Sequence, residues 1–401
     1  MKLHSLSNSA AKVGLFFFLV IISIGHLTTT DLSRLFIIPT RQISIAIIIC
    51  TIGISFLSKN LSIKQLTAAG LYISLVAYGM TLSALNGASD IGVQNISINV
   101  LVILSGIILI AGPSNAILPD RLSRYYVLYV LVGLCLTILV GGLELGFPPH
   151  FVFEYSSNLK STEYLYSQGI SQFFGYGALA AAYMLSNSDS KIRSLLLWTC
   201  VFLFLALSLL GGARGDSIAS VVVTLGYLAI QFRMRFLISV LVTGSILILY
   251  VNEWSYFFDN FQIFQRLGAV LEGDYGLRDQ LLSQVLNLLS LEPGCLVLGC
   301  GFGYFQHFYN FNVGLYPHNF IAESIIVFGL PLSSIFAVMV VGGARDYYRR
   351  IESVDLFLLF FTLSVLVSLK SGNLFGGWFV TAASMYFASI YCSKRIGKRV
   401  T

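Results

Sequence analysis

Several side chains in this sequence have the chemistry to bind a phosphate group or to move a proton: Arg214, Arg278, His318 and Glu323. The planar donors of a guanidinium suit phosphate oxygens, and the ionisation of a histidine changes near neutral pH. A carboxylate or a histidine also acts as a general base. The chemistry that these residue types predict is phosphate binding combined with proton transfer.

Arg214 lies in a tight turn between two apolar segments, Gly211-Gly212-Ala213-Arg214-Gly215-Asp216. An arginine at the depth of a membrane requires an anionic partner or a polar cavity. One interpretation is an ion pair with Asp216, or a side chain that reaches the lipid headgroups. The other is a phosphate clamp, to which the amides of Gly212 and Gly215 and the N-terminus of the following helix would add. The spacing alone leaves both interpretations open.

Two further arginines belong to a polar segment that covers residues 253–317. Apolar residues at four-residue spacing predict a short amphipathic helix that begins near Arg278: Leu277, Leu281, Val285 and Leu289. Within this window alone, a surface helix with a solvated Arg278 is the simpler interpretation. Arg266, flanked by aromatic and aliphatic residues, has a similar structural interpretation.

His318 and Asn319 follow this segment, at the start of a predicted helix. A single histidine at a helix end is more often structural than catalytic, and a proton acceptor or phosphate ligand is the functional alternative. Glu323 lies about 140° further round an ideal helix, so it need not share a face with His318.

Other motifs predict no metal and no cofactor. The sequence has no HExxH, Asp-x-Asp or Cys-x-x-Cys pattern, and its five histidines are scattered. The cluster Gly299-Cys300-Gly301-Phe302-Gly303 lacks the strand, turn and helix of a dinucleotide site, so we predict a close-packed turn. Cys295 and Cys300 either pair in an oxidising compartment or stay free.

The elements that must position these residues are predicted to be membrane helices. Of the 401 residues, 56% are hydrophobic and only 10% are charged, whereas soluble domains have about 25% charged residues. We expect an all-α polytopic membrane protein with about twelve transmembrane helices. The predicted segments lie near 10–27, 42–58, 66–85, 96–113, 125–145, 167–186, 194–212, 215–232, 234–252, 318–343, 354–370 and 373–392.

The charges predict an orientation for these helices. With both termini in the cytoplasm, 17 of the 24 Lys and Arg residues fall on the inner side, as the positive-inside rule requires. Helices 1 to 9 then occupy residues 1–252, a periplasmic segment occupies 253–317, and helices 10 to 12 with a cytoplasmic tail occupy 318–401. The excess of basic over acidic residues therefore indicates membrane topology and not nucleic-acid binding. The basic residues that oppose the rule are Arg34, Arg41, Lys160, Arg214, Arg266, Arg278 and Lys370.

The chain resembles the O-antigen polymerase and ligase superfamily. The resemblance rests on the Gly-Gly-Ala-Arg-Gly turn, Gly-Leu-Arg-Asp in the outer segment, the Gly-x-Gly-x-Gly turn, and Pro-His-Asn-Phe-Ile-Ala-Glu followed by Phe-Gly-Leu-Pro. It covers residues 165–335 best, and the N-terminal helices agree only in hydropathy. Ligases of this superfamily often have His-Asn, then nine residues, then Gly-x-x followed by Gly, Thr or Tyr. Here His318-Asn319 and Gly329 keep that spacing, but Leu332 occupies the last position, which weakens the ligase interpretation.

This resemblance implies a metal-independent glycosyltransferase in the bacterial inner membrane that acts at the periplasmic face. Its substrate would be an oligosaccharide linked to undecaprenyl pyrophosphate, and a chain-length regulator would be a possible protein partner. Arg214 and Arg278 would hold the pyrophosphate and His318 would assist transfer, with Arg266, Asn319, Glu323 and Gly215 at the substrate. The expected activity is an O-antigen polymerase; the alternatives are an O-antigen ligase and, more distantly, a flippase.

Overall fold

The structure is a computed structural model that describes residues 13, 62–111, 119–139, 143–144, 150–151, 168–249, 277–311, 315–351, 354–371, 374 and 377–400. The predicted segment near 42–58 lies outside these residues, as does all of the segment near 10–27 except Val13. Residues 253–276 of the predicted periplasmic segment also lie outside them.

The described part of the chain is almost entirely helical. The long helices are α4 (Ile63–Leu85), α5 (Ser89–Ile110), α6 (Pro119–Leu139), α7 (Gln168–Ser186), α8 (Lys191–Leu210), α9 (Arg214–Leu249), α15 (Phe320–Ile351), α16 (Leu356–Ser371) and α17 (Trp378–Val400). The shorter helices are α12 (Leu277–Leu291), α13 (Pro293–Val297) and α14 (Tyr304–Tyr309). Two strands of two residues each, β1 (Leu143–Glu144) and β2 (His150–Phe151), pair antiparallel.

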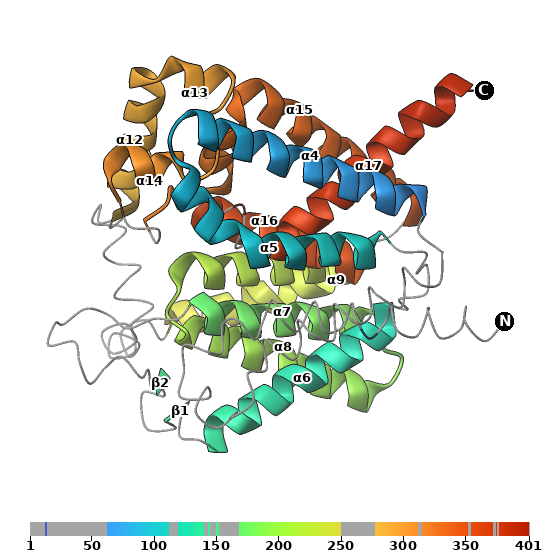
Figure 1. Ribbon diagram of the computed structural model, residues 1–401. Helices are drawn as coiled ribbons and strands as arrows, with labels where there is room; N and C mark the ends of the chain where they lie inside the picture. Colours follow the sequence, from blue (N-terminus) through green and yellow to red (C-terminus); the bar gives the residue numbers. More distant parts are fainter. Residues whose placement is uncertain are drawn as a thin grey trace, which may run out of the picture.

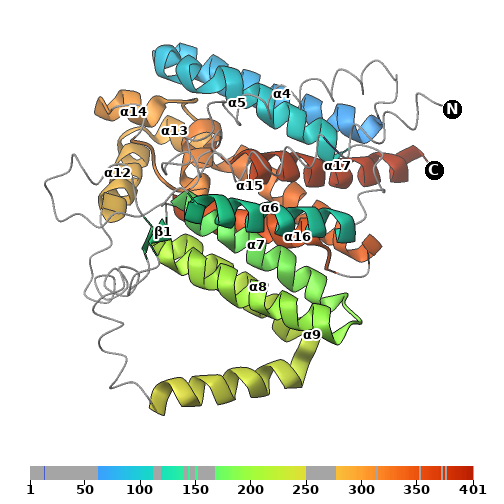
Figure 2. The same cartoon turned by 90° about the horizontal axis from the view of Figure 1, so that it is seen from below.

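The helices form two groups that meet along α16. Helices α4, α5, α15 and α17 pack together, and so do α6, α7, α8 and α9; α16 contacts helices of both groups. The short helices α12, α13 and α14 gather at one end of the bundle, whereas the C-terminal end of α17 leaves at the other (Figure 1). A view turned by 90° shows the same separation of the two ends (Figure 2).

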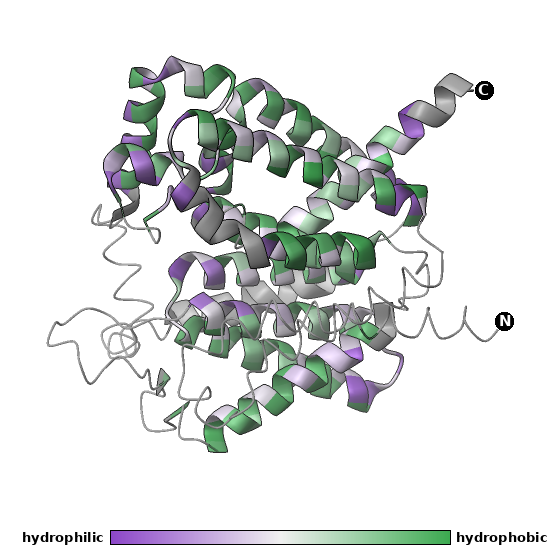
Figure 3. Cartoon of the chain, in the orientation of Figure 1, coloured by the Kyte–Doolittle hydropathy of each residue, from purple (hydrophilic) through white to green (hydrophobic). Residues whose placement is uncertain are grey.

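Five of the described helical segments are long and apolar enough to cross a membrane: Ile63–Leu85, Leu122–Leu139, Lys191–Leu210, Arg214–Phe232 and Phe320–Ile351. Figure 3 shows that most residues along these helices are hydrophobic. Helix α8 even exposes Leu195, Leu196 and Phe202, which water would disfavour and lipid tolerates. These features indicate an all-α membrane protein.

Helix α7 is the centre of its group. All residues from Gly169 to Leu185 are buried, because α6, α8 and α9 surround the helix. Its small residues allow this close approach: a Cβ added at Gly175 would overlap with Ser220 of α9. Small residues at helix contacts are typical of packing inside membranes, where close contact replaces the hydrophobic driving force.

Two predicted boundaries are wrong. The segments predicted near 215–232 and 234–252 form one continuous helix, α9, because Arg233, Met234 and Arg235 between them all favour helix. The C-terminal part of α9 extends away from the other helices (Figure 2). The segment predicted to reach residue 145 ends as a helix at Leu139, and Leu143 then belongs to β1.

The predicted segment near 318–343 is also interrupted. Gly329 has φ 78° and ψ 159°, which is not a helical conformation, and Pro331 follows it. Proline has no N–H to donate to the carbonyl four residues earlier. Helix α15 is therefore two arms joined at Gly329, and the hydroxyl of Ser333 on the second arm donates to the carbonyl of Ser324 on the first, at 2.9 Å.

Candidate functional site

A buried ion pair joins α9 to α16 at the end of the bundle that carries α12 to α14. Lys370 Nζ lies 2.9 Å from Asp216 Oδ2, and the Asp216 side chain is fully buried while that of Lys370 is 17% exposed. Asp216 lies in the first turn of α9 and Lys370 in the last turn of α16. Both charges therefore complement the dipoles of their own helices. Gln172 Nε2 of α7 also donates to Asp216 Oδ1, at 3.4 Å.

The Lys370 side chain lies against Gly215, the residue that follows Arg214 in the sequence. A Cβ added at Gly215 would overlap with the Lys370 side chain, so glycine is the residue that leaves room for this lysine. Arg214 is the first residue of α9 and is half-buried. The first turn of α9 thus brings a guanidinium and an ammonium to the same end of the helix.

Small polar residues hold the turn that precedes Arg214. Gly212 has φ 73°, in the left-handed region that favours glycine. The N–H of Ala213 donates to Ser171 Oγ of α7 at 3.3 Å, and Ser208 Oγ donates to the Ser171 carbonyl at 2.7 Å. Ser217 Oγ completes the connection by donating to the Ser208 carbonyl at 2.7 Å. The start of α9 is fixed to both α7 and α8, so Arg214 projects from a rigid base.

Asn319 connects the start of α15 to the end of α16. Its Oδ1 accepts the N–H of Ala322 at 2.9 Å, which caps the helix. Its Nδ2 donates to the carbonyl of Leu369 at 2.8 Å. Since Leu369 precedes Lys370, this bond fixes the start of α15 next to the ion pair. These two bonds give Asn319 a positioning role, and the substrate contact that the sequence suggested for it stays a prediction.

Glu323 connects the first arm of α15 to the segment between α16 and α17. Its Oε2 accepts the N–H of Leu374 at 2.7 Å. The carbonyl of Leu374 in turn accepts Thr381 Oγ1 at 3.1 Å. Asn319 and Glu323 therefore hold the same helical arm against residues on either side of Lys370, and Glu323 belongs to the same neighbourhood as the ion pair.

His318 directly precedes the cap of α15 and has an unusual backbone conformation. Its φ of 51° lies in the left-handed region, which residues other than glycine rarely adopt. Its ring lies against that of Tyr316, with 3.9 Å between the ring centroids and an angle of 35° between the ring planes. A positive φ at such a position is a backbone strain that the surrounding contacts must support. Tyr316 and the capped helix thus determine where the imidazole lies.

The other predicted arginines are described only in part. Arg278 is the second residue of α12, and its side chain lies outside the described residues, as does all of Arg266. Helix α12 forms as predicted: Leu281, Val285 and Leu288 are buried. They share a hydrophobic cluster with Ala322 and Ile326 of α15. The backbone at Arg278 is therefore part of the same end of the bundle as His318.

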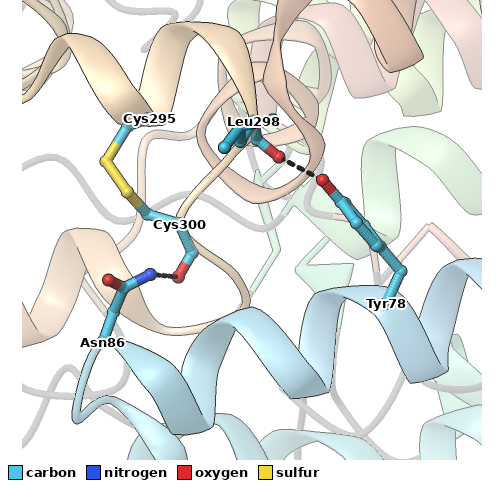
Figure 4. The surroundings of a disulfide bond; sticks show 5 residues. All are labelled: Tyr78, Asn86, Cys295, Leu298 and Cys300. Carbon is cyan, nitrogen blue, oxygen red and sulfur yellow. Dashed lines mark hydrogen bonds between the residues drawn. A yellow bond between two sulfur atoms is a disulfide. The ribbon is translucent and has the colours of Figure 1, made fainter.

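A disulfide-linked turn supports the break in α15. Cys295 and Cys300 are bonded (Figure 4), which decides between the two states that the sequence left open. The N–H of Cys300 donates to the carbonyl of Ile326 at 2.7 Å, and that of Gly301 to the carbonyl of Val327 at 3.2 Å. Pro331 has no N–H for Val327. The turn therefore supplies donors that the interrupted helix lacks.

The predicted glycine turn is confirmed by its backbone. Gly299, Gly301 and Gly303 all have positive φ. A Cβ added at Gly299 would overlap with the backbone of α15, and one at Gly301 with the backbone of α4. Side chains of α4 also bind this turn: Asn86 Nδ2 donates to the Cys300 carbonyl at 3.2 Å and Tyr78 Oη to the Leu298 carbonyl at 2.6 Å (Figure 4).

Sequence reasoning missed Lys370 and Asp216 as members of this site. Lys370 was visible as a charge that opposes the orientation rule within an apolar region, but its partner lies 154 residues away in the sequence. The site as described combines two cations, an imidazole and two carboxylates, at the starts of α9 and α15 and at the end of α16. Within the described residues, no three His, Cys, Asp or Glu side chains are grouped to hold a metal ion. Such a site can bind a phosphate and support proton transfer without one.

No protein-family model and no curated protein sequence matches the chain.

Proposed function

We propose that this protein is a metal-independent glycosyltransferase of the bacterial inner membrane, which polymerises a surface polysaccharide. The donor is a growing glycan on undecaprenyl pyrophosphate, and the acceptor is the non-reducing end of an incoming lipid-linked repeat unit. The observation that carries the proposal is that Lys370 lies against the first turn of α9, which begins with Arg214, and that Asn319 fixes this end of α16 next to the arm of α15 that carries Glu323 and follows His318.

The chemistry of the donor fits these residues. A glycosyl pyrophosphate is already activated, so catalysis must stabilise negative charge on the departing pyrophosphate and activate an acceptor hydroxyl. Preorganised cations in a water-poor site meet the first need. A histidine or a carboxylate meets the second. In this proposal Arg214 and Arg278 bind the pyrophosphate, Lys370 adds positive charge beside Arg214, and His318 accepts the proton of the hydroxyl.

The test is the surface polysaccharide of a strain that carries variants of this protein. We expect Arg214→Ala to remove the ladder of long chains and to leave core with a single repeat unit, while the protein reaches normal levels in the membrane. Arg214→Lys keeps the charge but loses the planar pair of donors, so we expect it to restore little of the ladder. A normal ladder from Arg214→Ala would disprove the proposal.

The nearest alternative is a ligase that transfers finished glycan to lipid A-core. Loss of a ligase would leave full-length polymer on its lipid carrier, which the same gel distinguishes. The more distant alternative is a flippase for the same lipid-linked sugars, which would place its charged and broken-helix features in paired halves near the bilayer midplane. The cations described above instead gather at one end of the bundle.

A further inference from the structure

The break in α15 creates a cavity of about 390 Å³. Ser333 Oγ reaches the Ser324 carbonyl, although nine residues of continuous helix would separate the two by about 13 Å along the axis. The two arms therefore meet at an angle, and we call the cavity between them the elbow cavity. Its other walls come from α4, α16 and α17, and its volume lies in the usual range of about 300–1,000 Å³ for ligand pockets.

The lining of the elbow cavity is almost entirely apolar. Its large side chains include Phe302, Phe328, Phe361 and Met385. The hydroxyls of Ser324 and Ser333 already donate to backbone carbonyls of α15, so they do not require a polar ligand. A hydrocarbon is therefore the chemical class that this cavity accommodates best.

One end of the elbow cavity is lined by sequence neighbours of the residues at the candidate site. Leu369, Phe320 and Ser324 line the cavity, and each directly adjoins a residue of the site: Lys370, Asn319 and Glu323. Leu374, whose N–H binds Glu323, lines it as well. A molecule with an anionic head at Arg214 and Lys370 would direct its tail into this space.

The cavity also has an open side. Ile321 and Leu330 line it and are 53% and 45% exposed, on a helix long and apolar enough to cross a membrane. A lipid chain would thus reach the cavity sideways from the bilayer, without leaving an apolar environment. The disulfide-linked turn keeps the wall in place, because Phe302 lines the cavity and packs against Gly79 of α4.

We propose that the elbow cavity binds the isoprenoid chain of the polyprenyl carrier, next to the cations that hold its pyrophosphate. The choice of a polyprenyl chain over other lipid chains rests on the proposed function. The cavity itself, its apolar lining and its position beside the ion pair do not. The break at Gly329 is then a binding feature, and Ile321, Phe328 and Ala337 contact the chain.

The test uses the purified full-length protein and a photoreactive undecaprenyl phosphate that carries a diazirine on its chain. We expect labelled peptides from both arms of α15, and competition by undecaprenyl phosphate but not by phosphatidylglycerol. Ala337→Phe fills the cavity and should lower labelling about tenfold or more, the scale of steric discrimination in apolar pockets. Val338→Phe is the matched control, since Val338 is exposed on the same helix and does not line the cavity.

Equal labelling of the two phenylalanine variants would overturn the proposal, as would equal competition by phosphatidylglycerol. If Ala337→Phe does not fold, Ala337→Cys replaces it: undecaprenyl phosphate should protect this cysteine, but not Val338→Cys, from N-ethylmaleimide. Unprotected Ala337→Cys overturns the proposal. The polysaccharide gel of Arg214→Ala remains a separate test. A normal ladder together with specific labelling would disprove the glycosyltransferase proposal and support the lipid site. A lost ladder together with unspecific labelling would support the glycosyltransferase and disprove the lipid site.

Discussion

The two ends of the helix bundle each carry a lysine–aspartate pair, in very different surroundings. At the end with α12 to α14, Asp216 is fully buried and Lys370 is 17% exposed. At the other end, Lys394 pairs with Asp346 at 2.5 Å, with 42% and 12% of their side chains exposed. The first pair joins α9 of one group to α16, which contacts both groups, and the second joins α15 to α17 within one group.

The surroundings differ as much as the burial. A cavity of about 360 Å³ at the second end has a basic lining that includes Arg345, Arg349 and Arg395. The elbow cavity at the first end is apolar. Charge at the second end is spread over a surface, whereas charge at the first end is confined and fixed by neighbouring groups. A confined charge is the kind that binds or reacts, because less water screens it.

The sharpest test of this comparison removes one partner from each pair. Asp216→Ala leaves Lys370 without its carboxylate in a largely buried setting, and breaking a buried pair this way costs about 3–5 kcal/mol. Asp346→Ala at the exposed pair should cost about 1 kcal/mol or less. The measurement is the free energy of unfolding of the purified protein in detergent. Similar losses for the two variants would show that the burial difference has no energetic meaning.

A second test acts on the space that Lys370 needs. Gly215→Ala adds a methyl group where the lysine side chain lies, and forced overpacking costs about 1–3 kcal/mol. Gly226 lies on the same helix with no atom near its added Cβ, so Gly226→Ala should be neutral or stabilising by about 1 kcal/mol. The measurement is the thermal unfolding temperature of each variant. If Gly215→Ala is as stable as Gly226→Ala, the lysine does not depend on this glycine.

The sequence predicts the helices better than it predicts the candidate site. Hydropathy predicted the helices because lipid leaves the backbone no partner outside its own segment, and it located α7, α8 and α16 to within a few residues. Hydropathy predicted one uninterrupted helix where α15 has two arms, because Gly329 and Pro331 change the mean hydropathy of the segment very little. The Asp216–Lys370 pair was not predictable, because it depends on how two helix groups meet. Arg214 stood out because it lies in a tight turn between two apolar segments and its charge opposes the expected orientation.

The disulfide provides a third test, at the end of the bundle where we place the site. Replacing Cys295 and Cys300 by serine removes a short covalent loop, for which chain entropy predicts a loss of about 2 kcal/mol. Cys135→Ser is the control, since Cys135 is free and exposed. Both are measured by unfolding with and without a reducing agent. We expect the reductant to destabilise the natural protein and the Cys135 variant alike, and to leave the double-serine variant unchanged.

The smallest expected effect lies at the second end, where burial raises the pKa of the Asp355 carboxyl above its usual range, opposed by hydrogen bonds from the Tyr347 hydroxyl and the Leu358 N–H. A pKa that is higher in the folded state than in the unfolded chain adds stability below the unfolded value, and this contribution is lost as the pH rises through the folded value. Asp355→Asn cannot ionise. Its stability relative to the natural protein should therefore rise as the pH increases from acidic to neutral, when unfolding is measured across that range. A relative stability that stays constant over this pH range would contradict this account of the Asp355 carboxyl.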